Sequence, residues 1–141
     1  MFISLPRQLI YCMRYLPLLV LLAFAGCDSS AFHKKLAAAD KVEIRFGTSQ
    51  SDVIEKYINT TNKDTIKKLE GFLTDASTGE FNCGSDGKLI LFAAGQQLES
   101  VDFRMYDKNC NHFSYLLDGK VTKCKMSDDA ADFLISLRGG K

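Results

Sequence analysis

The first 27 residues constrain the fold most, because they separate a targeting segment from the part of the chain that can form a domain. Arg7 and Arg14 precede a largely apolar run over residues 16–25, and the acidic Asp28 follows soon after it. This run is shorter than the roughly 20 apolar residues that a membrane-spanning helix needs. A basic region followed by a short apolar region is typical of an export signal. We therefore expect residues 1–26 to be removed and the domain to form from the rest.

The end of the apolar run resembles a known processing site. Phe24-Ala25-Gly26-Cys27 resembles the lipobox of small bacterial lipoproteins, in which small residues precede the cysteine at the cut site. The resemblance implies that the Cys27 thiol carries a diacylglyceryl group and that acyl chains such as palmitate are added. Two or more such chains give stable membrane anchoring. Because the resemblance covers the signal alone, it implies no activity and no family for the domain that follows.

The same resemblance implies a location and a domain organisation. A lipoprotein domain lies outside the cytoplasm, in the periplasm or elsewhere in the cell envelope, where disulfides form and persist. Asp28 resembles an inner-membrane retention signal of some enteric bacteria, but the sequence leaves the choice between inner and outer membrane open. We expect a lipidated cysteine and tether over 27–39 and a single globular domain over 40–141. The second half of the tether has a composition suited to a helix.

The charge of the chain excludes one class of partner. Of the 18 lysine and arginine residues, two lie in the signal. The remaining chain has 16 basic residues and 17 aspartate and glutamate residues, so its net charge is −1. Such a chain has no positive field to attract nucleic acid. The partners expected for it are the membrane, through the N-terminal lipid, and a protein of unknown identity.

The first half of the domain mixes strand and helix patterns. Residues 41–46 alternate apolar and charged side chains, which is typical of a half-buried strand. Residues 52–58 suit either state, because their apolar spacing fits a helical face and their β-branched and aromatic content fits a strand; we slightly prefer a helix. A clearer helix is predicted over 65–75, with Asn62 or Asp64 as its N-cap.

The next part of the domain has β patterns. One hairpin is predicted around Asp86-Gly87, with residues 81–84 as its first strand, because Asp-Gly turns match the twist of two paired strands. A turn is expected at 95–97, before another alternating strand. A second hairpin is predicted around Asp118-Gly119.

A final helix completes the predicted fold. Ser127 is suited to its N-cap, and Gly139 is suited to the left-handed position that follows a helix. The strands and helices are segregated along the chain. This order predicts an α+β fold with an antiparallel sheet of about four to six strands and two or three helices packed on one face.

Three cysteines remain once the signal and the anchor are set aside, so at most one internal disulfide forms. They are Cys83, Cys110 and Cys124. A two-residue turn at 118–119 sets Cys124 opposite Phe113 on the aromatic face of its hairpin, which favours a buried free thiol. We therefore expect a disulfide between Cys83 and Cys110, with the other two pairings left open.

A zinc site is the alternative use of these cysteines. Cys83, Cys110, His112 and Cys124 are residue types that hold structural zinc. No pair among them has the CxxC spacing that such sites usually use, and Cys110 and His112 are unusually close in sequence. We expect no metal and no other cofactor.

A catalytic interpretation depends on Cys110, His112 and Asp107. His112 would have to act as a base for an unbridged Cys110, and nothing near it in the sequence is placed to orient it, so we expect a histidine at the surface edge of a strand. No serine lies in a sharp Gly-flanked elbow. The expected function is a non-catalytic binding, interaction or inhibitory module of the envelope rather than an enzyme. The alternative is a small extracytoplasmic enzyme or ligand carrier with a site near Cys110 and His112.

A group of lysines lies near the C-terminal end of the β region: Lys120, Lys123 and Lys125. Lys123 and Lys125 alternate onto the outward face of their strand, where solvated charge discourages edge pairing. We expect this role for them. Attraction to anionic lipid headgroups is the alternative.

Overall fold

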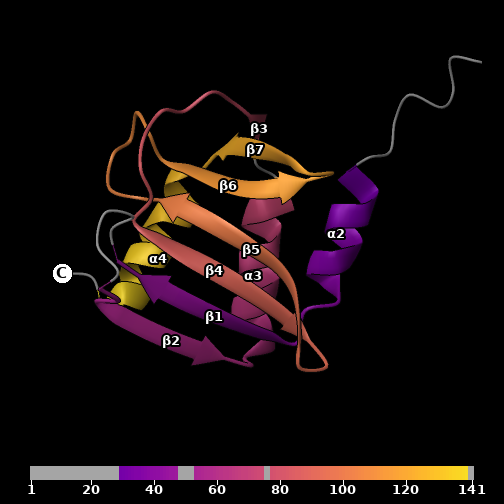
Figure 1. Ribbon diagram of the computed structural model, residues 1–141. Helices are drawn as coiled ribbons and strands as arrows, with labels where there is room; N and C mark the ends of the chain where they lie inside the picture. Colours follow the sequence, from indigo (N-terminus) through magenta and orange to yellow (C-terminus); the bar gives the residue numbers. More distant parts are fainter. Residues whose placement is uncertain (1–28, 48–52, 75–76, 140–141) are drawn as a thin grey trace, which may run out of the picture. The chain divides into compact units, whose positions relative to one another are not determined.

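The computed structural model describes residues 29–47, 53–74 and 77–139 (Figure 1). The chain divides into two compact units, Met1–Ala31 and Phe32–Lys141, and all of the strands belong to the second unit. The predicted signal and Cys27, the predicted site of lipidation, lie outside the described residues.

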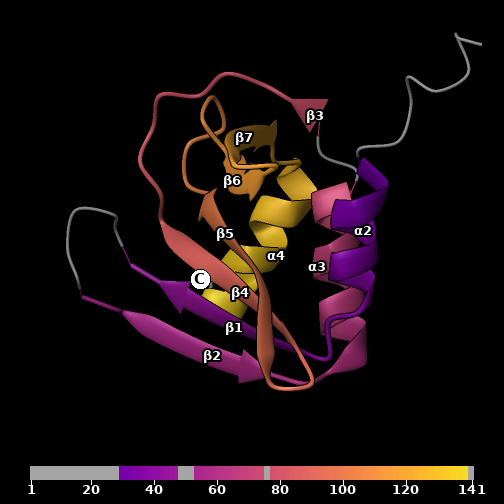
Figure 2. The ribbon, with the colours of Figure 1, turned by 45° about the vertical axis from the view of Figure 1, so that its right-hand side comes forward.

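The described residues form ten helices and strands. In chain order these are α2 (Ser29–Ala37), β1 (Lys41–Phe46), β2 (Lys56–Thr60), α3 (Lys63–Thr74), β3 (Ser77–Thr78), β4 (Gly87–Ala93), β5 (Gln96–Arg104), β6 (His112–Leu117), β7 (Lys120–Lys125) and α4 (Asp128–Arg138). The strands make one antiparallel sheet in the order β2-β1-β4-β5-β6-β7-β3, and the helices lie on one of its faces (Figures 1 and 2). The predicted α+β fold is confirmed, with the two-residue β3 added to six longer strands.

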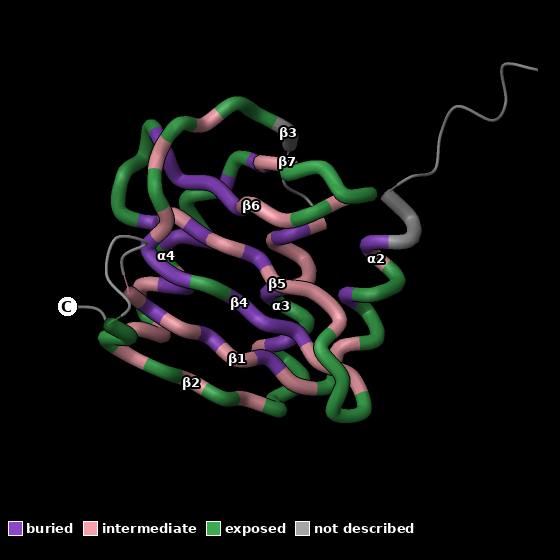
Figure 3. Tube along the Cα trace, in the orientation of Figure 1, coloured by how far each residue is buried: buried purple, intermediate pink, exposed green. Residues whose placement is uncertain are grey.

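Alternation along the strands builds the core. Val42 lies opposite Leu91 and Ile44 lies opposite Leu89, and every second residue of a strand points to the same face. These four side chains are almost completely buried, and Figure 3 shows the buried stretches along the central strands. The same cluster includes, from the other strands and from the helices, Val101, Phe103, Phe113, Ile66, Leu69, Leu73 and Leu134.

The tether expected over residues 27–39 is largely a helix of the domain. Phe32 and Leu36 of α2 are 4% and 0% exposed, and both belong to the core cluster. Their spacing of four residues places them on one side of the helix. The Phe32 ring stacks on the Tyr115 ring with 4.2 Å between centroids. The compact unit therefore begins at Phe32, earlier than the predicted boundary at residue 40, because α2 covers core that the sheet and the other helices leave open.

We expect Phe32→Leu to lower the free energy of unfolding by about 1–2 kcal/mol, because the smaller side chain leaves a gap and loses the stacking on Tyr115. Denaturant titration of the purified chain measures this change. His33→Ala is the matched control, since His33 is the next residue of the same helix and is only partly buried, and its expected cost is below about 0.5 kcal/mol. Equal effects of the two changes would mean that α2 does not pack on the domain in solution.

The slight preference for a helix over residues 52–58 was wrong for the described part of that segment, which contains β2. Ile58 lies opposite Ile44, and Lys56 lies opposite Phe46 of β1. The edge of β1 offers partners for the backbone groups on one side of the segment, and this pairing outweighs the local apolar spacing.

The hairpin predicted around Asp86-Gly87 was also wrong. Residues 79–86 form an irregular segment, and Gly87 is the first residue of β4 rather than part of a turn. A side chain at Gly87 would clash with the Arg45 carbonyl oxygen and with the Phe103 ring. Glycine is therefore required at this position for close approach within the sheet, and the sequence pattern mimicked a turn.

Two tight turns carry the hairpins that do form. Asp118 and Gly119 both have positive φ, and Phe113 lies opposite Cys124, so the predicted second hairpin has the predicted register. The turn expected at 95–97 falls slightly earlier, at Ala94 and Gly95, which both have positive φ. Paired positive φ angles match the twist of the flanking strands.

Both long helices begin at the side chains that the sequence indicated. Thr65 donates its backbone N–H to Asn62 Oδ1 at 2.9 Å, which makes Asn62 rather than Asp64 the cap of α3. Ala130 donates its N–H to Ser127 Oγ at 3.2 Å at the start of α4. Gly139 ends α4 in the left-handed conformation, with φ of 99°.

Candidate functional site

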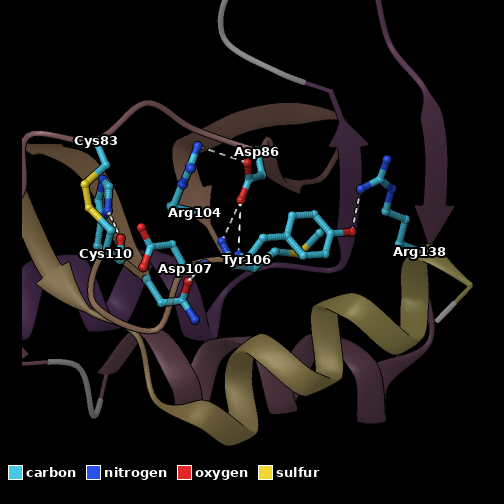
Figure 4. Close-up of polar contacts among 10 residues, drawn as sticks. Cys83, Asp86, Arg104, Tyr106, Asp107, Cys110 and Arg138 are labelled. Atoms are coloured by element: carbon cyan, nitrogen blue, oxygen red, sulfur yellow. Dashed lines mark hydrogen bonds and ion pairs between the residues drawn. A yellow bond between two sulfur atoms is a disulfide. The ribbon is translucent and has the colours of Figure 1, made fainter. Parts of the chain in front are cut away.

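Residues 79–86, which we call the crossing loop, connect β3 at one edge of the sheet to β4 near its middle (Figure 1). The loop is held along its length. Lys123 Nζ donates to the Phe81 carbonyl oxygen, and the Phe81 ring stacks on the His112 ring with 4.9 Å between centroids. The remaining attachments are a disulfide at Cys83 and a buried carboxylate at Asp86 (Figure 4). We call these four attachments together the clamp. It contains most of the site residues that the sequence suggested.

The predicted disulfide between Cys83 and Cys110 is present, with 6.3 Å between the two Cα atoms. Cys124 is a free thiol and is 2% exposed. Its Sγ lies 3.4 Å from the hydroxyl oxygen of Tyr115. Burial, together with this contact, raises the pKa of Tyr115 far above its ordinary value. The Tyr115 hydroxyl is therefore neutral, and the pair is part of the packed interior.

His112 was expected at the surface edge of a strand, and this expectation was wrong. The side chain is 3% exposed, and its Nδ1 lies 2.7 Å from the Cys110 carbonyl oxygen. The Phe81 ring covers the imidazole on the side away from the helices. The sequence could not indicate this burial, because it is the crossing loop, more than 25 residues away in the chain, that covers the histidine.

The alternative catalytic interpretation finds its three residues close together but otherwise engaged. The Cys110 sulfur is in the disulfide and so is not a free nucleophile. The Asp107 carboxylate accepts the backbone N–H of Asn109, and the Asp107 N–H donates to Asn111 Oδ1. A hollow of about 280 Å³ beside Tyr106 is lined partly by α4 but by neither Cys110 nor His112. These contacts shape the loop before β6.

The zinc alternative has no support in the described part of the chain, where no three histidine, cysteine, aspartate or glutamate side chains are grouped as metal ligands. Among the same residues, no helix is long and apolar enough to cross a bilayer.

Asp86 is the site residue that the sequence pattern missed. Its carboxylate is 9% exposed, accepts the N–H groups of Met105 and Tyr106 at 2.9 and 3.3 Å, and lies 3.3 Å from a guanidinium nitrogen of Arg104. Figure 4 shows the continuation to α4, where Arg138 donates to the Tyr106 hydroxyl. This hydrogen bond raises the pKa of Arg138. The Asp-Gly pair resembled a turn, and no local signal distinguishes it from an anchor of the crossing loop.

The sheet face opposite the helices is closed at its centre by charged side chains. Glu43 pairs with Lys41 and Arg45, each at 3.1 Å, and Ile90 beside it is only 6% exposed. The hydrogen bond from Lys41 outweighs burial and lowers the pKa of Glu43. The centre of this face therefore offers no apolar contact surface.

Among the described residues, five of the six large apolar side chains that remain exposed gather at the two sides of the sheet, and the sixth, Tyr106, contacts Arg138 of α4. Val53, Ile54 and Tyr57, which we call the β2 edge patch, are 65%, 53% and 49% exposed. Leu116 and Val121, which we call the hairpin patch, lie opposite each other on β6 and β7 and are 57% and 64% exposed. Strand order places these patches far apart in the sheet, with β2 at one edge and β6 and β7 toward the other.

The two charged residues between Ile54 and Tyr57 are directed toward α4, whereas the Glu43 carboxylate of β1 interacts with the Tyr57 side chain. Lys56 Nζ donates to the carbonyl oxygens of Leu137 and Arg138 at 3.0 and 2.8 Å, at the C-terminal end of α4. Glu55 pairs with the Arg138 guanidinium. Edge strands are commonly protected by charged side chains. Here both charged side chains bind to α4. Residues 57–60 of the edge include no charged side chain.

Among the described strands, β2 pairs with β1 alone, so the backbone groups on its outer side have no strand partner there. Gly47, which follows β1, donates its backbone N–H to the Asp86 carbonyl oxygen, on the side of β1 that faces β4. Successive residues of a strand point their backbone groups to alternate sides. Phe46 therefore directs its groups to β2, where its partner is Lys56. By the same alternation the backbone groups of Tyr57 and Asn59 point outward, along the open edge of the sheet.

Comparison of this chain with the profiles of protein families, with curated proteins and with solved structures finds no match.

Proposed function

We propose that this chain is a lipid-anchored protein of the bacterial envelope whose domain binds an extended segment of a partner protein at β2. The anchor is Cys27, in the lipobox-like Phe24-Ala25-Gly26-Cys27. The domain is a binding module without catalytic chemistry of its own.

The uncharged open edge of β2 carries this proposal. A strand whose outward N–H and C=O groups have no partner can accept a further strand, and the main-chain hydrogen bonds supply affinity. Val53, Ile54 and Tyr57 lie at the beginning of this edge and would cover the apolar side chains of the added segment. An extended peptide is the occupant that matches both features, because it provides backbone groups and alternate side chains together.

Photocrosslinking in intact cells tests the proposal. A photoreactive amino acid in place of Tyr57 in the full chain is expected to give a discrete adduct whose partner peptide maps to one segment. The same amino acid in place of Lys67, an exposed residue of α3, is the matched control and is expected to give none. Equal adducts at both positions, or none at Tyr57, would contradict the proposal.

A second variant connects the adduct to strand addition. Asn59→Pro removes an outward N–H but no hydrogen bond to β1, and proline is tolerated on edge strands. The Tyr57 adduct is expected to disappear in this variant while its thermal unfolding stays cooperative. Ile54→Asp, which places a charge beside the edge at a side chain that is 53% exposed, is expected to abolish the Tyr57 adduct in the same way and covers the case in which the proline variant unfolds.

A further inference from the structure

The hairpin of β6 and β7 lies next to the part of the domain that the anchor must reach. Phe32 stacks on Tyr115 of β6, and the turn at Asp118 follows three residues later. Cys27 precedes Phe32 by five residues, which span at most about 18 Å when fully extended. Three residues of a strand cover about 10 Å. A lipid on Cys27 therefore holds the bilayer surface within reach of the hairpin turn, which Figure 1 shows beside α2.

The exposed chemistry of this hairpin matches a lipid surface. Leu116 and Val121 form a cross-strand pair on the face away from the helices, and both are more than half exposed. Lys120 and Lys125 are exposed on the same hairpin. Apolar side chains flanked by lysines are suited to the boundary between headgroups and acyl chains, where the lysines meet anionic phosphates.

Other charges near the turn leave the hairpin basic. Lys123 belongs to β7 as well, although its ammonium group holds the crossing loop at Phe81. Asp118 is the acidic residue of the turn, and Glu80 of the crossing loop lies beside Val121 and Lys123. Lys120, Lys123 and Lys125 together outnumber these two carboxylates, so the hairpin keeps a net positive charge toward a membrane.

We propose that the hairpin of β6 and β7 rests on the bilayer that holds the lipid anchor, with Leu116 and Val121 in the headgroup region. This inference relies on the lipid anchor of the proposed function. It sets the orientation of the domain, because β2 lies at the other edge of the sheet. The edge that we assign to a partner protein then points away from the membrane, and the two surfaces do not compete.

Tryptophan fluorescence tests the contact, since the chain contains no tryptophan. Val121→Trp places a single fluorophore in the hairpin patch. Tyr57→Trp places one at the β2 edge and is the matched control, because Tyr57 is also half exposed on a strand. The purified lipidated full chain is reconstituted in vesicles of phosphatidylethanolamine and phosphatidylglycerol that carry a spin-labelled headgroup as quencher. We expect strong quenching and a blue shift for Val121→Trp and neither for Tyr57→Trp.

Two further measurements separate the failures of the two proposals. Mass spectrometry of the N-terminal peptide and flotation of the vesicles report whether Cys27 carries lipid and anchors the chain. An anchored chain whose Val121→Trp fluorescence is not quenched would overturn the hairpin contact and leave the anchor intact. A chain without lipid on Cys27 would overturn both.

The lysines supply an independent readout in the same vesicles. Adding Lys120→Glu to Val121→Trp, or replacing phosphatidylglycerol with phosphatidylcholine, is expected to reduce the quenching, because each change removes attraction between the hairpin and anionic headgroups. Quenching that is indifferent to both changes, or equal for Val121→Trp and Tyr57→Trp, would contradict a specific contact of this hairpin.

Discussion

A chain in which alanine replaces both Cys83 and Cys110 is expected to lose about 3–4 kcal/mol of its free energy of unfolding. The disulfide joins residues that are 27 positions apart and restricts the unfolded chain accordingly. In the chain-entropy model, a loop of this length accounts for a stabilisation of that size. The bridge also fastens the middle of the crossing loop, so its loss is expected to expose His112, which the loop now covers.

Denaturant titration under oxidising conditions measures this loss, with Cys124→Ala as the control. Cys124 is buried but unbridged, so its replacement removes only local packing and costs about 1 kcal/mol. Alkylation of the unfolded, exported chain without reductant is expected to label Cys124 alone, and reduction is expected to release two more thiols. A double variant as stable as Cys124→Ala would show that the bridge does not form or does not stabilise the fold.

Asp86→Ala is expected to destabilise the domain by about 3 kcal/mol. The change leaves the Met105 N–H without its acceptor in a buried position and removes the partner of the Arg104 guanidinium. Arg104 is about one-third exposed, so water replaces part of the lost ion pair. Most of the expected cost therefore comes from the unsatisfied backbone groups.

The ion pair of Asp102 with Lys88 provides the comparison for Asp86. It lies on the same face of the sheet with 3.4 Å between the charged atoms, but both side chains are nearly half exposed. Asp102→Ala is therefore expected to cost no more than about 0.5 kcal/mol. Thermal and denaturant unfolding of the two variants side by side test the assignment, and equal destabilisation would mean that Asp86 is not an anchor of the crossing loop.

Under the proposed lipid anchor, the two exposed patches allow the small domain to contact two surfaces at once. In the proposed arrangement, the hairpin of β6 and β7 contacts the lipid bilayer, and β2 presents an open edge to a protein. The clamp between the patches contains Asp86, the disulfide and His112, and it keeps the strands between the two sides in register. A change in the clamp is therefore expected to affect stability before it affects either contact.

Features that depend on neighbouring residues were predictable. Ser127 and Gly139 limit α4 as expected, because helix caps are set by side chains and backbone conformations within a few residues. The turn at Asp118-Gly119 set Phe113 opposite Cys124, because a two-residue turn determines the register of its hairpin. That register assigned Cys124 to the interior and favoured the bridge between the other two cysteines.

Features that depend on distant partners were not predictable in the same way. The sequence of α2 has the composition of a tether, and only Tyr115, more than 80 residues later, shows that Phe32 belongs to the core. β2 is a strand because the edge of β1 is available to it. Asp86 and His112 resembled a turn residue and a surface residue, since the loop that buries them gains its position from contacts across the sheet.

The sequence by itself determined the α+β class, the register of the second hairpin and the caps of α4, because each follows from local periodicity or from a short turn. It favoured the pairing of Cys83 with Cys110 but left the other two pairings open. Only the tertiary structure decided that α2 belongs to the domain, that the crossing loop covers His112, and that exposed apolar side chains gather at opposite sides of the sheet. The physical reason is that burial and edge exposure are set by contacts between segments far apart in the chain. The pattern of residues within one short segment does not predict those contacts.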